Sequence, residues 1–241
     1  MRNMATSSAS PKGIAAVVGV GPKLGRSIAR RLSRFADQIA REEKAQVFAI
    51  RIDCSDSRSI REAFEGVLSL GFVEVLVYNA CQPVPWNPTN FTDVPIESFE
   101  KSLAVSTVGA FHCAQQVIPG MMERGRGTII FTGCSGSLNG IAGFSELSCG
   151  KFALRGLSQC LAKEFLPLGI HVAHIIIDGI VSAPRSSTST SQRTAIGEQQ
   201  QLVDGSMDPD ALAQTYWYLH VQDRTAWTQE IDLRSSNQRY L

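Results

Sequence analysis

The stretch that decides the fold class of this chain is Ile14-Ala15-Ala16-Val17-Val18-Gly19-Val20-Gly21-Pro22-Lys23-Leu24-Gly25-Arg26. It is a short apolar, β-branched run, followed by a turn of glycine and proline and then by the start of a helical pattern. A glycine-rich turn between a strand and a helix is typical of a phosphate cradle. The missing Cβ atoms let the backbone approach a pyrophosphate, and the helix N-terminus presents unpaired N–H groups. The segments that follow this turn decide its interpretation.

The composition excludes several classes of function. The net charge of +1 over 241 residues creates no field that would attract nucleic acid or an anionic membrane, and no apolar stretch is long enough for a membrane span. The 6 cysteines form no CxxC pair and no Cys/His cluster with metal-ligand spacing, so no metal site is predicted. We interpret them as buried thiols of a reducing compartment, which predicts a cytoplasmic protein.

The ends and connections of the chain indicate its domain organisation. Residues 1–12 are rich in serine and alanine and lack the apolar core of a secretion signal. We expect a disordered tail there, with a short organelle-targeting segment as the alternative. Residues 13–241 contain no repeat and no linker, which predicts a single domain. The serine-, threonine- and glutamine-rich residues 182–206 lack periodicity and are expected to form a loop.

Strands and helices alternate along the chain. Strands are predicted at 45–52, 73–77, 128–131, 170–177 and 230–233. Helices are predicted at 24–44, after a cap at Ser55 or Asp56, and at 96–122, 148–165 and 209–219. This alternation predicts a parallel sheet with helices on both faces, in which ligands bind outside the carboxyl ends of the strands. The loops expected at that edge are 19–25, 53–56, 78–81, 132–137 and 178–185.

Apolar residues spaced by three and four predict which helical side chains are buried. In the first helix they are Leu24, Ile28, Leu32, Phe35 and Ile39. In the second they are Ile60, Phe64 and either Val67 or Leu68, and in the helix at 148–165 they are Phe152, Leu157, Leu161 and Phe165. On the strand at 170–177, His171 and His174 point to opposite faces, which argues against a shared metal ion.

The order of these elements resembles the short-chain dehydrogenase/reductase family over nearly the whole chain. Five segments carry the resemblance. They are Val18–Gly25 for the family's TGxxxGxG turn, Asp53-Cys54 for its Asp-Val, Tyr78-Asn79-Ala80-Cys81 for its Asn-Asn-Ala-Gly, Lys151-Phe152-Ala153-Leu154 for its lysine helix, and Asp178-Gly179 for its Pro-Gly. The resemblance implies a Rossmann-like, doubly wound parallel sheet in three α/β/α layers. It also implies hydride transfer between a nicotinamide cofactor and a small carbonyl or alcohol.

The resemblance implies a set of cofactor-binding positions. They are Gly19, Gly21, Lys23, Leu24, Gly25, Asp53, Cys54, Asn79, Ala80, Lys151, Gly179 and Ile180. The cofactor is NADP or NAD, and NADP is slightly favoured because Lys23 suits a 2′-phosphate, although a solvated lysine is an equal alternative. Asp53 either contacts adenine or caps the next turn, and Asn79 is expected mainly to hold the sheet together. The family also implies a mobile substrate lid at 182–206, or an ordinary loop, and a homo-oligomer formed through the helix that begins at Ile96.

The catalytic positions depart from the family's pattern. The family's tyrosine, its general acid or base, stands four residues before the lysine, and that position here is Leu147. The position of the serine that polarises the carbonyl matches Cys134, and that of the relay asparagine matches Ser106. Lys151 alone is kept. Candidate catalytic residues are therefore Lys151, Ser135 and Cys134, with Cys134 expected to be a buried small residue because no histidine lies near it in sequence.

The first half of the chain is abbreviated. The family has a strand between the first helix and the strand that ends at Asp53, and here none precedes Val47. We interpret this as a deletion, as in a splice variant, with two outcomes. Either the strand at 47–52 pairs beside the first strand, or a gap exposes a strand edge. The function expected is that of a family oxidoreductase with a degraded Ser-Tyr-Lys site, and the alternative is a non-catalytic nucleotide-binding or subunit-pairing homologue.

Overall fold

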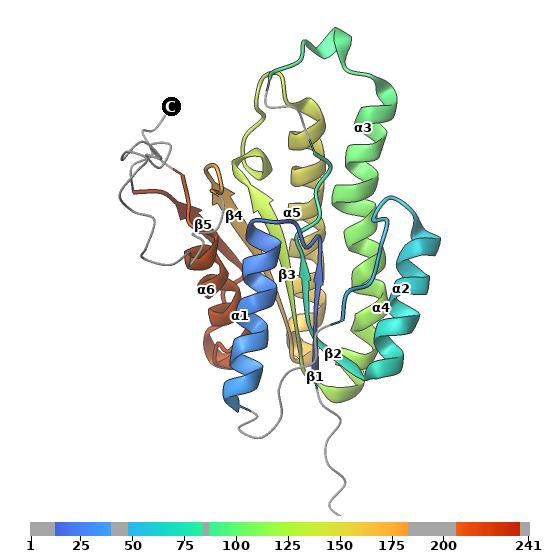
Figure 1. Cartoon of the computed structure of the whole chain (residues 1–241), viewed down its shortest axis with the longest axis vertical. Helices are drawn as coiled ribbons and strands as arrows, with labels where there is room; N and C mark the ends of the chain where they lie inside the picture. Colours follow the sequence, from blue (N-terminus) through green and yellow to red (C-terminus); the bar gives the residue numbers. More distant parts are fainter. Residues whose placement is uncertain (1–12, 40–47, 84–86, 183–205, 237–241) are drawn as a thin grey trace, which may run out of the picture.

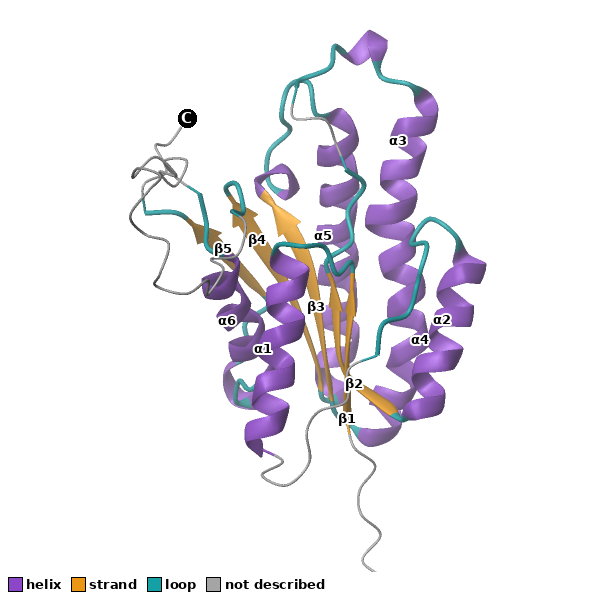
Figure 2. Cartoon of the chain, viewed as in Figure 1, coloured by secondary structure: helices purple, strands orange, loops and turns teal. Residues whose placement is uncertain are grey.

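A five-stranded parallel sheet forms the centre of the molecule. The computed structural model describes residues 13–39, 48–83, 87–182 and 206–236. The strands are β1 (Gly13–Val18), β2 (Phe72–Tyr78), β3 (Gly127–Cys134), β4 (Ile170–Asp178) and β5 (Glu230–Arg234). They follow one another across the sheet in chain order, and each neighbouring pair is parallel. The predicted α/β class with a parallel, Rossmann-like sheet is thereby confirmed (Figure 2).

Helices cover both faces of this sheet (Figure 1). On one face lie α1 (Leu24–Ile39) and α6 (Pro209–His220), and on the other lie α2 (Ser57–Leu70), α4 (Gly109–Arg124) and α5 (Ser145–Phe165). The helix α3 (Ile96–Leu103) continues into α4 through a π-helical turn at Ala104–Val108. Two separate hydrophobic cores result, one on each face of the sheet.

The strands read as continuous apolar runs because both of their faces are buried. In β2, Leu76 and Tyr78 belong to the core under α2, α4 and α5, whereas Val75 and Val77 belong to the core under α1 and α6. In β4, His171 bonds to the carbonyl of Leu219 at the end of α6, and His174 lies on the side of α5. The predicted opposite orientation of the two histidines is confirmed.

The predicted helical faces agree with the structure except at Phe152, and the side chains of Phe35 and Ile39 lie outside the described part of the chain. Asp56 caps α2 by accepting a hydrogen bond from the backbone N–H of Arg58. Of the two alternatives in that helix, Val67 packs against the core and Leu68 is 40% exposed. In α5 the prediction for Phe152 is wrong, because that ring is 42% exposed and Leu154 is buried instead.

The predicted strand at 45–52 is wrong over its described part. Residues 48–52 form no strand, and the side chains of Phe48 and Ile50 are 60% and 44% exposed. The chain is instead turned into α2, because the N–H of Asp53 donates to Ser59 Oγ and its carbonyl accepts from the N–H of Asp56. Within the described residues β1 pairs with β2 alone, so β1 is the edge of the sheet and the outcome in which 48–52 pairs beside it is excluded.

Three further expectations concern other parts of the chain. Residues 1–12, 45–47 and 183–205 lie outside the described residues, as does the predicted part of the first helix beyond Ile39. All 6 cysteines are free, but the prediction that they are buried holds in full only for Cys113. Cys54 and Cys134 are half-buried, and Cys81, Cys149 and Cys160 are exposed because they lie on a loop and on the outer face of α5. Among the described helices, none has the length and apolar character needed to cross a bilayer.

Candidate functional site

The glycine turn after β1 uses its three glycines in three different ways. Gly19 has a φ of +86°, and a methyl group there would lie 2.5 Å from the backbone nitrogen of Ala80. A methyl group on Gly25 would lie 2.4 Å from the carbonyl oxygen of Gly19. By contrast, no atom lies within 4 Å of the position that a methyl group on Gly21 would take. Gly19 and Gly25 are therefore required for packing, whereas Gly21 leaves an open space above the turn.

Two side chains join this turn to the segments that follow β2 and β4. The amide of Asn79 donates to the carbonyl of Gly19 at 3.0 Å, and the backbone N–H of Asn79 donates to the carbonyl of Val18 at 2.9 Å. The ammonium of Lys23 donates to the carbonyl of Val181, just beyond β4, at 2.9 Å. These bonds give Asn79 the sheet-holding role expected of it, and they place Lys23 between the glycine turn and the end of β4.

The predicted adenine edge is held by a turn of its own. The carboxylate of Asp53 accepts from both the N–H and the hydroxyl of Ser55, at 2.9 and 2.7 Å, and these bonds lower the pKa of that exposed carboxyl group. Cys54 is half-buried, and burial raises the pKa of its thiol. A methyl group on Gly109 of α4 would lie 2.3 Å from the carbonyl of Cys54, so the loop rests directly on that helix.

Tyr78 ends β2 and anchors the central helix. Its hydroxyl donates to the carbonyl of Val105 in the π-helical turn, and burial raises the pKa of the phenol. The next residue of that turn, Ser106, is fully buried, and its hydroxyl has no hydrogen-bond partner among the described residues. Ser106, at the position expected for the family's asparagine, packs against Gly150 of α5.

Lys151 lies buried at the carboxyl end of β3. The side chain is 3% exposed, and its ammonium donates to the carbonyl of Thr132 at 2.8 Å. Leu147 stands one helical turn earlier on α5 and is half-buried. Residues four apart on a helix share a face. An aliphatic side chain, which cannot transfer a proton, therefore shares the helix face of Lys151.

The turn after β3 carries Cys134, Ser135 and Ser137. The hydroxyl of Ser137 accepts from the N–H of Cys134 at 3.2 Å, and the thiol of Cys134 accepts in return from the N–H of Ser137. Burial raises the pKa of the Cys134 thiol, and the charge of Lys151 opposes this effect. Ser135 is half-buried, and its carbonyl accepts from the N–H groups of Leu138 and Asn139. Ser137 is fully buried, so its predicted role as a turn former is the one that the geometry displays.

The remaining predicted positions border the same edge of the sheet. Leu24 and Ala80 are buried at 8% exposure beneath the glycine turn. Gly179 follows β4 with a φ of +153°, and Ile180 beside it is 49% exposed. The structure thus brings the predicted residues from the ends of β1, β2, β3 and β4 to one edge.

Sequence reasoning missed one titratable side chain at this edge, His174. It is 1% exposed, and its Nδ1 lies 3.1 Å from Glu230 Oε2 on β5. Glu230 is held in turn by Arg155 through two hydrogen bonds of 2.7 and 2.8 Å. A methyl group on Gly133 would lie 2.3 Å from His174 Nε2, so this ring atom faces the end of β3. Only the sheet register, which sequence spacing does not give, brings this histidine next to the Cys134 turn.

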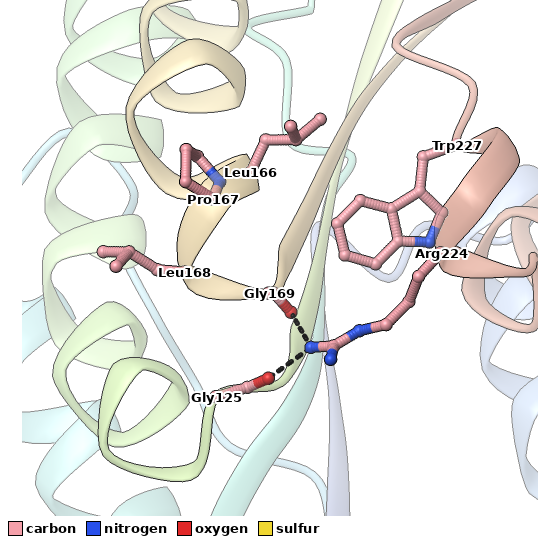
Figure 3. A pocket seen from close by; sticks show the side chains of 7 residues that line it. All are labelled: Gly125, Leu166, Pro167, Leu168, Gly169, Arg224 and Trp227. Carbon is pink, nitrogen blue, oxygen red and sulfur yellow. Dashed lines mark hydrogen bonds between the residues drawn. The ribbon is translucent and has the colours of Figure 1, made fainter.

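A separate hollow of about 300 Å³ lies at the opposite, amino end of the sheet. Its lining comes from Gly125, Leu166, Pro167, Leu168, Gly169, Arg224 and Trp227. Figure 3 shows the guanidinium of Arg224 between the carbonyls of Gly125 and Gly169, to which it donates. The arginine therefore joins the segments that precede β3 and β4. This hollow holds none of the predicted site residues.

Comparison with protein families gives an assignment that agrees with this geometry. The family model described as short chain dehydrogenase matches residues 14–194. This chain belongs to the short-chain dehydrogenase family. The match covers the glycine turn, the Asn79 loop, the Cys134 turn and the helix of Lys151.

Individual relatives and structures show how close the likeness is. A short-chain dehydrogenase/reductase of Armillaria gallica is 30% identical over 189 residues, which are 70% of this chain and 71% of that protein. Human 17-beta-hydroxysteroid dehydrogenase type 1 is 35% identical over 127 residues, which are 52% of this chain but only 37% of the human protein. The crystal structure of an alcohol dehydrogenase from Thermococcus sibiricus, complexed with 5-hydroxy-NADP, superposes with a TM-score of 0.73 at 21% identity, covering 95% of this chain and 99% of that one.

Proposed function

We propose that this family member binds a nicotinamide dinucleotide, NADP(H) or NAD(H), at the carboxyl edge of its sheet. The observation that carries the proposal is the turn at Gly19–Gly25. Asn79 locks it in place, and the position over Gly21 is open where a methyl group would otherwise stand. This open backbone at a helix N-terminus fits a pyrophosphate. When bound, the nicotinamide would supply the hydride, and a small carbonyl or alcohol would be its reaction partner.

The residues of this chain suit binding better than turnover. We propose that Lys151, whose ammonium lies at the carbonyl of Thr132, holds the ribose beside the nicotinamide, while Asn79 keeps the glycine turn in shape. Leu147 can neither donate nor accept a proton. Removing a positioned general acid costs about 10²- to 10⁴-fold in rate. We therefore propose a degraded Ser-Tyr-Lys site with weak oxidoreductase activity, in which Lys151 with a bound water, Ser135 or Cys134 would have to supply the proton.

The adenosine end is where the site is incomplete. Family members read the adenosine ribose from the end of a strand beside the first one, and β1 is the edge strand here within the described residues. Asp53 is already bonded to Ser55, and Lys23 to the carbonyl of Val181. We propose that binding relies mainly on the pyrophosphate and nicotinamide ends. The slight preference for NADP requires the Lys23 ammonium to exchange the carbonyl of Val181 for the 2′-phosphate.

Titration of the purified protein with NADPH and with NADH, followed by melting temperature and nicotinamide fluorescence, tests binding. A ligand at 100 times its dissociation constant stabilises the folded state by about 2.7 kcal/mol. Gly21→Ala should melt like the wild type yet lose the shift, because its methyl group meets no protein atom but occupies the cradle. Gly156→Ala, also in open space but inside α5, should keep the cofactor-induced shift, and its own melting temperature should be at or above that of the wild type because alanine is the better helix former. If neither cofactor shifts the wild-type melt, the proposal fails.

A second candidate function, subunit pairing without catalysis, is favoured by exposed apolar side chains on the central helices. Ile96, Val108, Phe111, Met122 and Phe152 are each between 42% and 61% exposed on α3, on the π-helical turn, on α4 and on α5. We propose that this face forms a homo-oligomer. Sedimentation velocity of the wild type and of Phe111→Glu checks it, because a dimer should dissociate in the variant.

The compartment follows from thiol chemistry. All 6 cysteines are free, and three of them are exposed. Free exposed thiols persist in reducing compartments. We therefore place the protein in the cytoplasm. Mass spectrometry of intact protein after alkylation of cell lysate would count 6 free thiols if this is correct.

A further inference from the structure

The hydrogen-bonding of His174 fixes its tautomer. Arg155 donates two hydrogen bonds to Glu230, and these bonds lower the pKa of the Glu230 carboxyl group, which is thus an acceptor only. His174 Nδ1, 3.1 Å from Glu230 Oε2, must therefore carry the proton. In the neutral ring this leaves Nε2 as an acceptor. Nε2 is buried and has no hydrogen-bond partner among the described residues.

That free acceptor lies near the hydroxyl of Ser137. A methyl group on Gly133 would lie 2.3 Å from His174 Nε2 and 2.7 Å from Ser137 Oγ, so these two atoms are within about 5 Å of each other. Ser137 Oγ already accepts the N–H of Cys134, which leaves its own proton available for donation. Rotation of the serine side chain, or one water molecule between the two atoms, would complete a chain of hydrogen bonds from the Glu230 carboxylate through the His174 ring to the Ser137 hydroxyl.

We propose that Glu230, His174 and Ser137 form a proton relay behind the Cys134 turn, which couples the reactivity of the Cys134 thiol to the protonation of His174. His174 is a positioning residue that acts through Ser137. With a neutral ring, the Ser137 hydroxyl donates to Nε2. When Nε2 takes up a proton it becomes a donor to Ser137 Oγ, and the serine proton then turns towards the sulfur of Cys134.

The charges around the ring set the pH at which this happens. Glu230 on β5 favours the protonated ring, whereas burial and the cations Lys151 and Arg155 on α5 disfavour it and together hold the pKa of His174 below its usual value. Near neutral pH the ring is therefore neutral and the thiol is protonated, because burial raises the thiol's pKa. On acidification the imidazolium and the turned hydroxyl both stabilise a thiolate.

The rate of Cys134 alkylation by iodoacetamide against pH tests the relay, with the modified peptide followed by mass spectrometry so that the exposed cysteines do not interfere. A lone thiol loses reactivity tenfold per pH unit below its pKa. In the wild type we expect the alkylation rate to show a shoulder on the acid side. There the rate should exceed the value expected of a lone thiol by about tenfold for each unit by which the imidazolium lowers the thiol pKa. His174→Gln and Ser137→Ala should both remove the shoulder, and Glu230→Gln should move it to lower pH.

His171→Gln is the matched control, because His171 is buried on the same strand but faces α6. It should leave the shoulder intact. If a site variant fails to fold, nitrogen-15 NMR of the wild-type ring still decides the question, since the relay requires the Nδ1–H tautomer for His174. A single-thiol pH curve in the wild type, or an Nε2–H tautomer, would overturn the proposal. Neither readout needs bound cofactor, so this result is independent of the proposed nucleotide binding.

Discussion

Restoring the phenol tests whether Leu147 is what limits turnover. In the double variant Leu147→Tyr, Cys134→Ser, the new tyrosine stands one helical turn from Lys151, with about 5–6 Å between the Cβ atoms. We take the same separation for the phenol oxygen and the ammonium. With an effective dielectric constant of about 20, that charge stabilises a phenolate by about 3 kcal/mol. This lowers the pKa of the phenol by about 2 units, from about 10 to about 8. A general acid so tuned accelerates reduction by about 10²- to 10⁴-fold.

The assay is NADPH or NADH oxidation with a panel of electron-poor carbonyls, such as quinones and 1,2-diketones, after binding of the cofactor has been measured. The single variant Cys134→Ser is the matched control, because it restores the carbonyl-polarising hydroxyl but not the acid. We expect turnover in the double variant and little in the control. A double variant that binds cofactor like the wild type and gains no turnover would refute the assignment of position 147 as the place where the general acid is missing.

Three further predictions concern the supports of the site and its pH dependence. Tyr78→Phe leaves the buried carbonyl of Val105 without its donor and should lower the free energy of unfolding by about 1–3 kcal/mol. The melting temperature should fall by about 2–4 °C per kcal/mol. Tyr218→Phe, at a 57% exposed position, is the control and should cost almost nothing. Asn79→Ala removes the hydrogen bond to the carbonyl of Gly19 and should lower the free energy of unfolding by about 0.5–1.5 kcal/mol. It should also weaken cofactor binding, which isothermal titration calorimetry measures. An unchanged affinity would contradict a glycine turn held in shape by this amide. Burial lowers the pKa of His171, His174 and His220. As the pH falls, these rings therefore take up protons in the unfolded chain before they do so in the folded chain. Stability should therefore be complete above about pH 6.5 and fall on acidification, by at most about 1.4 kcal/mol per pH unit for each ring, and urea unfolding at a series of pH values that shows no such slope contradicts the assignment.

Much of the fold was predictable from local pattern. Buried parallel strands are continuous apolar runs, and the strand at 73–77 reads as one because helices cover both of its faces. The caps are equally local, as Asp56 shows by bonding to a backbone N–H two residues away. The alternation in Ala45–Ile52 was misleading because a strand also needs a partner, and residues 48–52 have no pairing with the sheet.

The site divides in the same way. The roles of Gly19, Gly25 and Asn79 follow from a turn whose contacts are close in sequence or one strand away, and a family pattern indicates them. The neighbourhood of Cys134 does not, because His174 is 40 residues further along the chain and comes near this turn only through the register between β3 and β4. Spacing along the chain led to the expectation of a thiol without a histidine. The register instead brings His174 to the peptide next to it.

The two departures from the family's pattern act at opposite ends of the expected cofactor, and this makes them separable. No strand lies beside β1 within the described residues, and we expect this to weaken cofactor binding at the adenosine end without touching the reacting atoms. We expect the aliphatic Leu147 to lower turnover at the nicotinamide end without removing a contact to the pyrophosphate. Lys151 is not part of either departure. Its ammonium donates to the carbonyl of Thr132, and the residue shares a helix face with position 147. If the protein binds the cofactor without turnover, and the tyrosine at position 147 brings turnover back, the missing general acid limits its activity. If it cannot bind the cofactor, the shortened first half limits it.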